Sequence, residues 1–409
     1  MDEIARLVRA FSPGERVFLP GSAGEVIPLM PALADGPPLD ITASFVTGIN
    51  HPPLDHLPEG SRWTGLFAQR EPRGAQGRGL LRQLVHSYGG FARAIAHGDG
   101  FDTCVAQVAP PDQDGNCSLG AAVEFTPLAA RKSRRVMAVI NPRMPRIPGA
   151  ASLPYRDFAL VAEIDAPLRA YDVGAPTAQA AAIAERIAGY IDDGATLQIG
   201  LGKVPDALLR QLTDRRRLRL HSGMLSDGVR LLVESGSLDD GWVHVSCVHV
   251  GTQGYYDWLA GRPGFAVRGC EETHAPATLA GLARLVAVNG ALSVDLFGQA
   301  NLEMLDGRAV SGVGGAADFA RAAGFAADGI SIVALPATSG GSDLPRIVPR
   351  LDSIVSLPRQ DVDVVITEHG AADLRGRSVV ERGRALIAIA APQHRGALEA
   401  AFADIARTL

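Results

Sequence analysis

The stretch Leu218–Val229 reads L-R-L-H-S-G-M-L-S-D-G-V, and the fold is inferred most directly from it. A short apolar run, interrupted by Arg219, ends at a polar turn, and Asp227-Gly228 leads into the next element. In an open α/β sheet, the groups that bind or react gather beyond the carboxyl ends of the strands. The stretch therefore predicts a strand whose end borders a functional site.

Length and composition favour two domains that combine helices with sheets. A chain of 409 residues exceeds one ordinary core. Aromatic residues make up only 5% of the chain and glycines number 46, which suits layers in which helices lie close on sheets. We expect an N-terminal domain of residues 1–170 and a C-terminal domain of residues 175–409, joined near Asp165–Gly174.

Charge and cysteine usage exclude several classes of protein. The net charge of -5, from 39 basic and 44 acidic residues, gives no general attraction to nucleic acid or to an anionic membrane. Met1–Arg9 lacks the apolar segment of a signal peptide, and no apolar run approaches ~20 residues. The four cysteines, Cys104, Cys117, Cys247 and Cys270, are scattered along the chain without metal-ligand spacing, so we expect no metal site. Scattered cysteines also suit a reducing compartment, and we expect a cytoplasmic protein.

Strand and helix patterns alternate through both halves of the chain. Predicted strands cover Val17–Leu19, Ile41–Phe45, the run from Phe101, the run from Val136 and the run from Ala195. Predicted helices run from the Pro20–Gly24 turn to about Leu33, over Thr177–Asp192, and up to Leu209. His244 and His249 lie on a valine-rich strand, where we expect core positions rather than site residues.

The opening stretch resembles the active-site strand of the acetyl-CoA hydrolase/CoA-transferase family, which reads roughly I-H-T-E-M-x-S-D-G-V. Further stretches resemble motifs of the same family, in the same order, from about Val17 to Phe402. They are F-D-T-C-V-A-Q-V-A-P-P-D-Q-D-G-N-C-S-L-G from Phe101, L-Q-I-G-L-G-K-V-P-D-A-L-L from Leu197, V-N-G-A-L-S-V-D-L-F-G-Q-A-N from Val288, S-G-V-G-G-A-A-D-F from Ser311, and V-V-I-T-E-H-G-A-A-D-L-R from Val364.

The resemblance implies a fold, a substrate and an assembly. The fold would be two open-sheet α/β domains of the NagB/RpiA/CoA-transferase type, with the active site in the cleft between them. The substrate would be a coenzyme A thioester, together with a small carboxylate or another acyl acceptor, and no cofactor would be tightly bound. Members of the family are commonly homodimers or larger, so we expect a homo-oligomer.

One position departs from the family at its centre. In the family, the glutamate of I-H-T-E-M is the nucleophile and carries coenzyme A as a glutamyl-CoA intermediate; Gly223 stands in its place here. Glycine has no side chain, so no covalent intermediate can form at residue 223. A one-residue slip of the strand would turn every side chain to the opposite face, so a change of register does not restore the glutamate. Ser293 likewise replaces a second family glutamate.

The resemblance assigns roles to the remaining residues. Glu368, or His369 in place of the usual tyrosine, would be the general base, and His274 with the backbone of Gly314 or Gly315 would supply donors for the oxyanion. A tight loop and a satisfied core histidine are the structural alternatives. Residues expected to contact coenzyme A or the acyl group are Gly200, Gly202, Gly223, Ser293, Gly312, Gly315, Gly340, Gly341 and Gly370.

Three functional interpretations remain open. Water or an acceptor attacks the thioester directly, in the space that the glutamate leaves. Alternatively, the chain binds an acyl-CoA without converting it, or another carboxylate carries out ordinary CoA transfer. Direct product formation, an unreacted bound thioester, or a glutamyl-CoA adduct elsewhere would distinguish the three.

Overall fold

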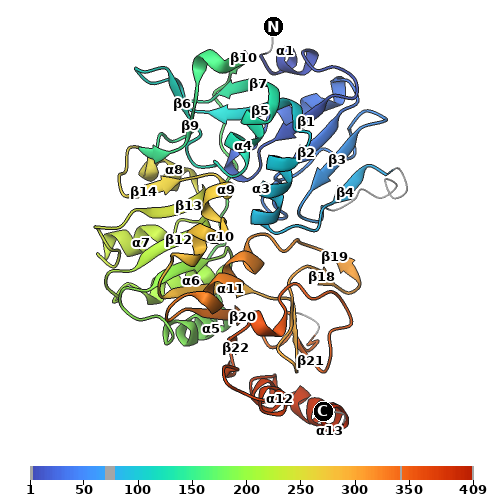
Figure 1. Ribbon diagram of the computed structural model, residues 1–409, viewed down its shortest axis with the longest axis vertical. Coiled ribbons are helices and arrows are strands. Elements are labelled where there is room, and N and C mark those ends of the chain that lie inside the picture. The colour runs from blue at the N-terminus through green and yellow to red at the C-terminus, as the bar shows by residue number, and fades with distance from the viewer. Residues whose placement is uncertain (1–2, 70–78, 341–342, 408–409) are drawn as a thin grey trace. The chain divides into compact units, whose positions relative to one another are not determined.

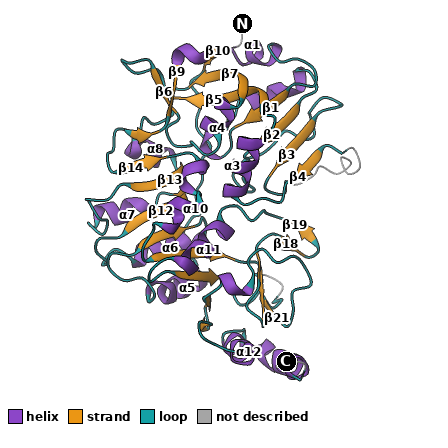
Figure 2. Ribbon diagram, in the orientation of Figure 1, coloured by secondary structure: helices purple, strands orange, loops and turns teal. Residues whose placement is uncertain are grey.

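The computed structural model describes residues 3–69, 79–340 and 343–407, which form two compact units. The first unit comprises Met1–Asp172, Gly223–Asp227 and Val243–Ala275, and the second comprises Val173–Ser222, Gly228–Trp242 and Pro276–Leu409. Figure 1 shows the chain coloured from blue at the N-terminus to red at the C-terminus, and Figure 2 shows that helices and strands alternate throughout.

The first unit is built on a parallel sheet of seven strands, in the order β10-β7-β5-β1-β2-β3-β4. Apolar side chains of β1 and β2 and of α1 form its core with Trp63. The strands are β1 (Arg16–Leu19), β2 (Asp40–Ala43), β3 (Arg62–Gly65), β4 (Leu81–Gln83), β5 (Phe101–Val108), β7 (Ser133–Ile140) and β10 (Phe158–Glu163), and the helices are α1 (Glu3–Arg9), α3 (Tyr88–His97) and α4 (Thr126–Arg131).

Later segments of the chain complete the first unit. Strand β14 (Phe265–Val267) pairs in parallel with β13 (His244–His249) on one side and with β8 (Gly149–Ala150) on the other. In the sequence, α8 (Gln253–Leu259) lies between β13 and β14, and the short α9 (Cys270–Thr273) follows β14. An antiparallel pair joins β6 (Asn116–Ser118) to β9 (Ser152–Pro154). His244 and His249 are buried on β13, as the sequence predicts.

The second unit contains a sheet whose strands run in the order β23-β22-β20-β15-β11-β12, parallel except for the β22–β23 pair. They are β11 (Thr196–Ile199), β12 (Arg219–Leu225), β15 (Leu285–Gly290), β20 (Ile330–Ala334), β22 (Val364–Thr367) and β23 (Gly370–Asp373). The helices are α5 (Ala178–Ala188), α6 (Lys203–Gln211), α7 (Val229–Glu234), α10 (Pro276–Ala280), α11 (Ala316–Phe325), α12 (Val379–Ala388) and α13 (Pro392–Ala406).

Small sheets extend the second unit. Strand β16 (Ser293–Asp295) pairs with β17 (Ala300–Asn301) and with β21 (Ile347–Val348), and β18 (Met304–Leu305) forms a hairpin with β19 (Arg308–Ala309). Strand β12 begins in the second unit, and its residues from Gly223 onward belong to the first.

The α/β prediction with open parallel sheets is confirmed, and so are the predicted strands and the helix that follows Pro176, which the Thr177 hydroxyl caps. The predicted helix up to Leu33 is wrong. That segment holds only the 3-10 turns Ser22–Gly24 and Leu33–Asp35 and the one-turn α2 (Leu29–Ala32), because Pro28 and Pro31 have no N–H for a continuous helix. Among the residues the structure describes, no helix combines the length and the apolar character needed to cross a bilayer.

Candidate functional site

Gly223 and His274, both predicted as site residues, lie against each other in the first unit. A Cβ added to Gly223 would be 3.4 Å from Nε2 and 3.6 Å from Cε1 of the imidazole. His274 follows α9 and is 1% exposed, and its Nδ1 lies 2.8 Å from the Thr273 hydroxyl. The Tyr88 ring packs against the imidazole, with 5.3 Å between the ring centroids. The end of strand β12 therefore faces a buried histidine.

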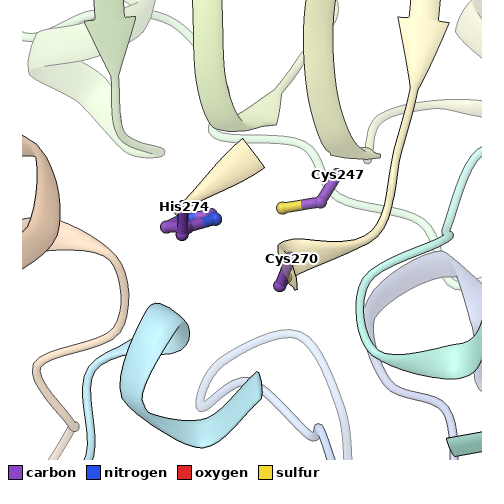
Figure 3. A group of neighbouring side chains, drawn as sticks. All are labelled: Cys247, Cys270 and His274. Atoms are coloured by element: carbon purple, nitrogen blue, oxygen red, sulfur yellow. The ribbon is translucent and has the colours of Figure 1, made fainter. Parts of the chain in front are cut away.

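Two cysteines join this pair, and the sequence prediction missed them as site residues. The Cys247 thiol on β13 donates a hydrogen bond to the carbonyl oxygen of Gly223, with 2.9 Å between the sulfur and the oxygen. Cys270 is the first residue of α9, and both cysteines are completely buried. Burial, followed by the interaction with Cys247, raises the pKa of Cys270 well above its ordinary value. In Figure 3 the sulfur of Cys247 points toward the imidazole of His274.

Backbone hydrogen bonds hold these segments in place. The N–H groups of Val123 and Glu124 donate to the Cys247 carbonyl, at 3.0 and 3.2 Å, and the Cys270 N–H donates to the Glu124 carbonyl at 2.8 Å. The segment around Glu124 thus bridges β13 and the start of α9. Because these bonds link residues far apart in the sequence, no local pattern could reveal them.

Glu124 is a third residue near this site that sequence reasoning missed. Its side chain is buried and accepts hydrogen bonds from the hydroxyls of Ser22 and Ser44, each at 2.6 Å. Burial raises its pKa to about 7, although the two hydroxyls and the Gly21 N–H partly oppose the rise. Its backbone φ of 41° is also strained for a residue with a side chain. Burial is the main cause that raises the pKa of Tyr88, and the charge of Glu124 adds to it.

The glycine-rich turn after β1 carries a structural network. A Cβ on Gly21 would lie 2.1 Å from the Ser44 carbonyl oxygen, so close backbone approach explains this glycine. Glu25 is buried and accepts hydrogen bonds from Asn50 Nδ2 at 2.6 Å and from Arg169 Nε at 2.9 Å. These contacts fix the turn between the first two strands of the chain.

In the second unit, Glu368 and His369 follow β22. One oxygen of Glu368 accepts a hydrogen bond from Gln179 Nε2 at 2.7 Å, and the other accepts from the backbone N–H of Ala337 at 2.9 Å. His369 Nε2 lies 3.8 Å from Glu368 Oε1, and the two side chains are 31% and 16% exposed. A fixed carboxylate beside a half-buried imidazole suits proton transfer.

Three of the predicted site glycines, Gly202, Gly314 and Gly315, lie in loops that lead into helices. Gly202 has a φ of 128° and precedes α6, and Gly314 has a φ of 56° and precedes α11, with Gly315 at the N-cap position. Backbone N–H groups at such a helix start favour negative charge.

The other residues predicted to contact coenzyme A or the acyl group are spread over several loops and strands. Among described atoms, a Cβ on Gly200 or on Gly340 would meet nothing within 4 Å, and Gly370 begins β23. Ser293 accepts a hydrogen bond from Asn301 Nδ2 at 3.2 Å. Gly312 lies in the loop before Gly314, whereas Gly341 lies outside the described residues.

Family comparison covers both halves of the chain. Residues 80–158 match the acetyl-CoA hydrolase/transferase N-terminal domain, and residues 251–402 match the C-terminal domain. The 4-hydroxybutyrate coenzyme A transferase of Clostridium kluyveri is 36% identical over 306 residues, which are 73% of this chain and 71% of that protein. The succinyl-CoA:acetate/propanoyl-CoA:succinate CoA transferase of Fasciola hepatica is 33% identical over 314 residues, 74% of this chain and 66% of that protein.

Solved structures agree with the sequence relatives. RipA from Yersinia pestis superposes with a TM-score of 0.90 at 28% identity, over 98% of this chain and 96% of that one. The 4-hydroxybutyrate CoA-transferase of Porphyromonas gingivalis gives a TM-score of 0.81 at 27% identity, over 100% of this chain and 97% of that one. The predicted enzyme family is therefore confirmed: the chain belongs to the acetyl-CoA hydrolase/CoA-transferase family.

Proposed function

We propose that this chain processes an acyl-CoA thioester by direct attack of water or of another acceptor, without a glutamyl-CoA intermediate at residue 223. One observation carries the proposal. Gly223 occupies the strand position at which the family motif has its nucleophile, and its α-carbon faces the His274 imidazole. In the hydrolytic form of the reaction, water adds to the thioester carbonyl and the C–S bond breaks. The products are the free acid and coenzyme A thiol.

The roles that we propose for the other residues are supported by their contacts. Glu368 and His369 are the candidate bases, because the carboxylate is held by two hydrogen bonds and lies near the imidazole. Backbone N–H groups at Gly314 and Gly315 supply donors for the charge that develops on the carbonyl oxygen, and His274 is a further donor. The substrate class comes from the relatives, whose names describe CoA transferases.

Trapping of intermediates tests the proposal. The protein is incubated with acetyl-CoA, butyryl-CoA or succinyl-CoA, quenched with borohydride or hydroxylamine, and digested for mass spectrometry. We expect free coenzyme A and the acid, with label from ¹⁸O-water in the acid, and no modified carboxylate. A glutamyl-CoA adduct on another residue would identify an ordinary CoA-transferase and overturn the proposal. Unchanged thioester that remains bound would identify a binding protein and overturn it as well.

Binding and assembly are tested separately. Calorimetry with coenzyme A and its acyl esters should show binding, and no binding at millimolar concentration would contradict the substrate class. We also propose a homodimer or a larger homo-oligomer, by analogy with the family. Light scattering that gives a stable monomer at micromolar concentration would contradict that assembly.

A further inference from the structure

Three soft or borderline metal ligands gather beside Gly223, although the sequence spacing of the cysteines predicts no metal site. One ligand atom from each of Cys247, Cys270 and His274 lies within 4.8 Å of the other two (Figure 3). The three residues are 0%, 0% and 1% exposed. Cys270 and His274 are four residues apart around the one-turn α9, so they lie on the same face, and β13 brings Cys247 to them.

We propose that Cys247, Cys270 and His274 form a binding site for a thiophilic divalent ion of the zinc type. Two thiolates and one imidazole are a ligand set that zinc accepts in proteins. On a tetrahedral zinc ion these atoms would lie roughly 3.5–3.8 Å apart, as follows from zinc–sulfur and zinc–nitrogen bonds of about 2.3 and 2.0 Å. Separations of at most 4.8 Å therefore need to close by at most about 1.3 Å.

The protons and charges of the binding step balance. One zinc ion displaces one proton from each thiol, so two protons leave and the two thiolate charges offset the charge of the ion. Cys247 then gives up its hydrogen bond to the Gly223 carbonyl. The contact between His274 Nδ1 and the Thr273 hydroxyl orients the ring, and Nε2 is the ring nitrogen that we assign to the ion.

The position of the site gives it a functional meaning. The imidazole that would bind the ion is the one that faces Gly223, so the ion would lie close to the strand end where the family motif carries its nucleophile. Three protein ligands leave a tetrahedral ion one further position, which water or a sulfur ligand can fill. A histidine Nε2 that binds the ion carries no proton, so His274 cannot bind the ion and donate a hydrogen bond from Nε2 at the same time. The metal site does not rest on the proposed reaction, because it is measured without any acyl-CoA.

Zinc titration of the reduced, metal-free protein tests the site. We expect one zinc ion per chain, released by a chelator, and about 100-fold weaker binding in Cys247→Ser, Cys270→Ser and His274→Ala. Cys104→Ser is the matched control, because Cys104 is a free thiol, completely buried, in the same apolar cluster as Cys247 and Cys270. Absence of stoichiometric binding, or binding that survives all three ligand substitutions, would overturn the proposal.

A second measurement on the unmodified chain keeps the test decisive if a variant fails to fold. X-ray absorption of the zinc-loaded protein should show two sulfur ligands and one nitrogen ligand, and titration in weak buffer should release two protons per ion. A shell of oxygen and nitrogen alone would overturn the site. A disulfide between Cys247 and Cys270 in protein purified without reductant, with no zinc uptake after reduction, would overturn it too.

Discussion

The α-carbon of Gly223 lies against the imidazole of His274, close enough that one added carbon at residue 223 would touch Nε2 at 3.4 Å. That distance is an ordinary van der Waals contact. Gly223 lies in strand β12 and is not among the glycines with positive φ, so its backbone also accepts a side chain. Neither strain nor a steric clash at the first carbon therefore excludes a larger residue.

The substitution Gly223→Glu should create CoA-transferase activity. It places a carboxylate on a strand that otherwise resembles the family's, and a carboxylate can attack the thioester carbonyl. We expect a trapped glutamyl-CoA at residue 223 and transfer of coenzyme A from acetyl-CoA to a free carboxylate; Ser293→Glu is added if the single variant is inactive. The matched control is Gly223→Gln, which has the same size without the nucleophile. Equal gain in the Gln variant, or no adduct in the double variant, would contradict this expectation.

The substitution Glu368→Gln should lower turnover about 100-fold or more if the carboxylate is the base, because a positioned base contributes roughly 10²–10⁴-fold. The amide oxygen can still accept the Ala337 N–H bond, so the loss would report proton transfer rather than misfolding. His369→Ala gives the corresponding test of the imidazole. Exposed Glu399 on α13 provides the control Glu399→Gln, whose turnover should be unchanged. Full activity in both site variants would remove these residues from the mechanism.

The substitution Gly314→Ala should lower kcat more than it raises KM. An alanine at a φ of 56° costs roughly 1 kcal/mol and shifts the backbone N–H groups that start α11, which are the proposed oxyanion donors. Gly236→Ala is the matched control, because Gly236 has a φ of 67° with nothing described within 4 Å of an added Cβ. Both variants should lose similar stability in urea. Equal kcat values in the two variants would argue against donors in this loop.

The substitution Arg169→Met should destabilise the protein by about 3 kcal/mol or more, because it leaves the fully buried Glu25 carboxylate without its charged partner. The control Arg143→Met removes an exposed ion pair with Asp165, whose N···O distance is 2.6 Å, and should change the free energy of unfolding far less, because water screens exposed charges. Chemical denaturation measures both free energies of unfolding. Similar losses would mean that burial does not set the strength of these pairs.

Local patterns in the sequence predicted several of the elements. Apolar runs located strands such as β5 and β11, and Pro176 with Thr177 located the start of α5. They overestimated one helix, where Pro28 and Pro31 limit the structure to single turns. Gly223 and His274 were both predicted as site residues from family motifs, and in the structure a Cβ added to Gly223 would lie 3.4 Å from the imidazole.

The cysteines and Glu124 could not be placed from the sequence. Cys247 meets His274 across 27 positions of the chain, and Glu124 reaches Cys270 through a backbone bond between segments far apart. Such contacts depend on how strands pair and have no local periodicity. The one local signal was the spacing of Cys270 and His274, which a helical turn places on one face.

The ordinary extended backbone of Gly223 has a consequence for small molecules. Because the family's carboxylate is absent at this position, a free carboxylate such as formate or acetate can be tested for chemical rescue. An exogenous carboxylate bound there would attack the thioester carbonyl, the C–S bond would break, and the products would be a mixed anhydride and coenzyme A thiolate. Turnover that rises with formate in the native chain, but not in Gly223→Gln, would show that a dissolved carboxylate can supply the missing functional group.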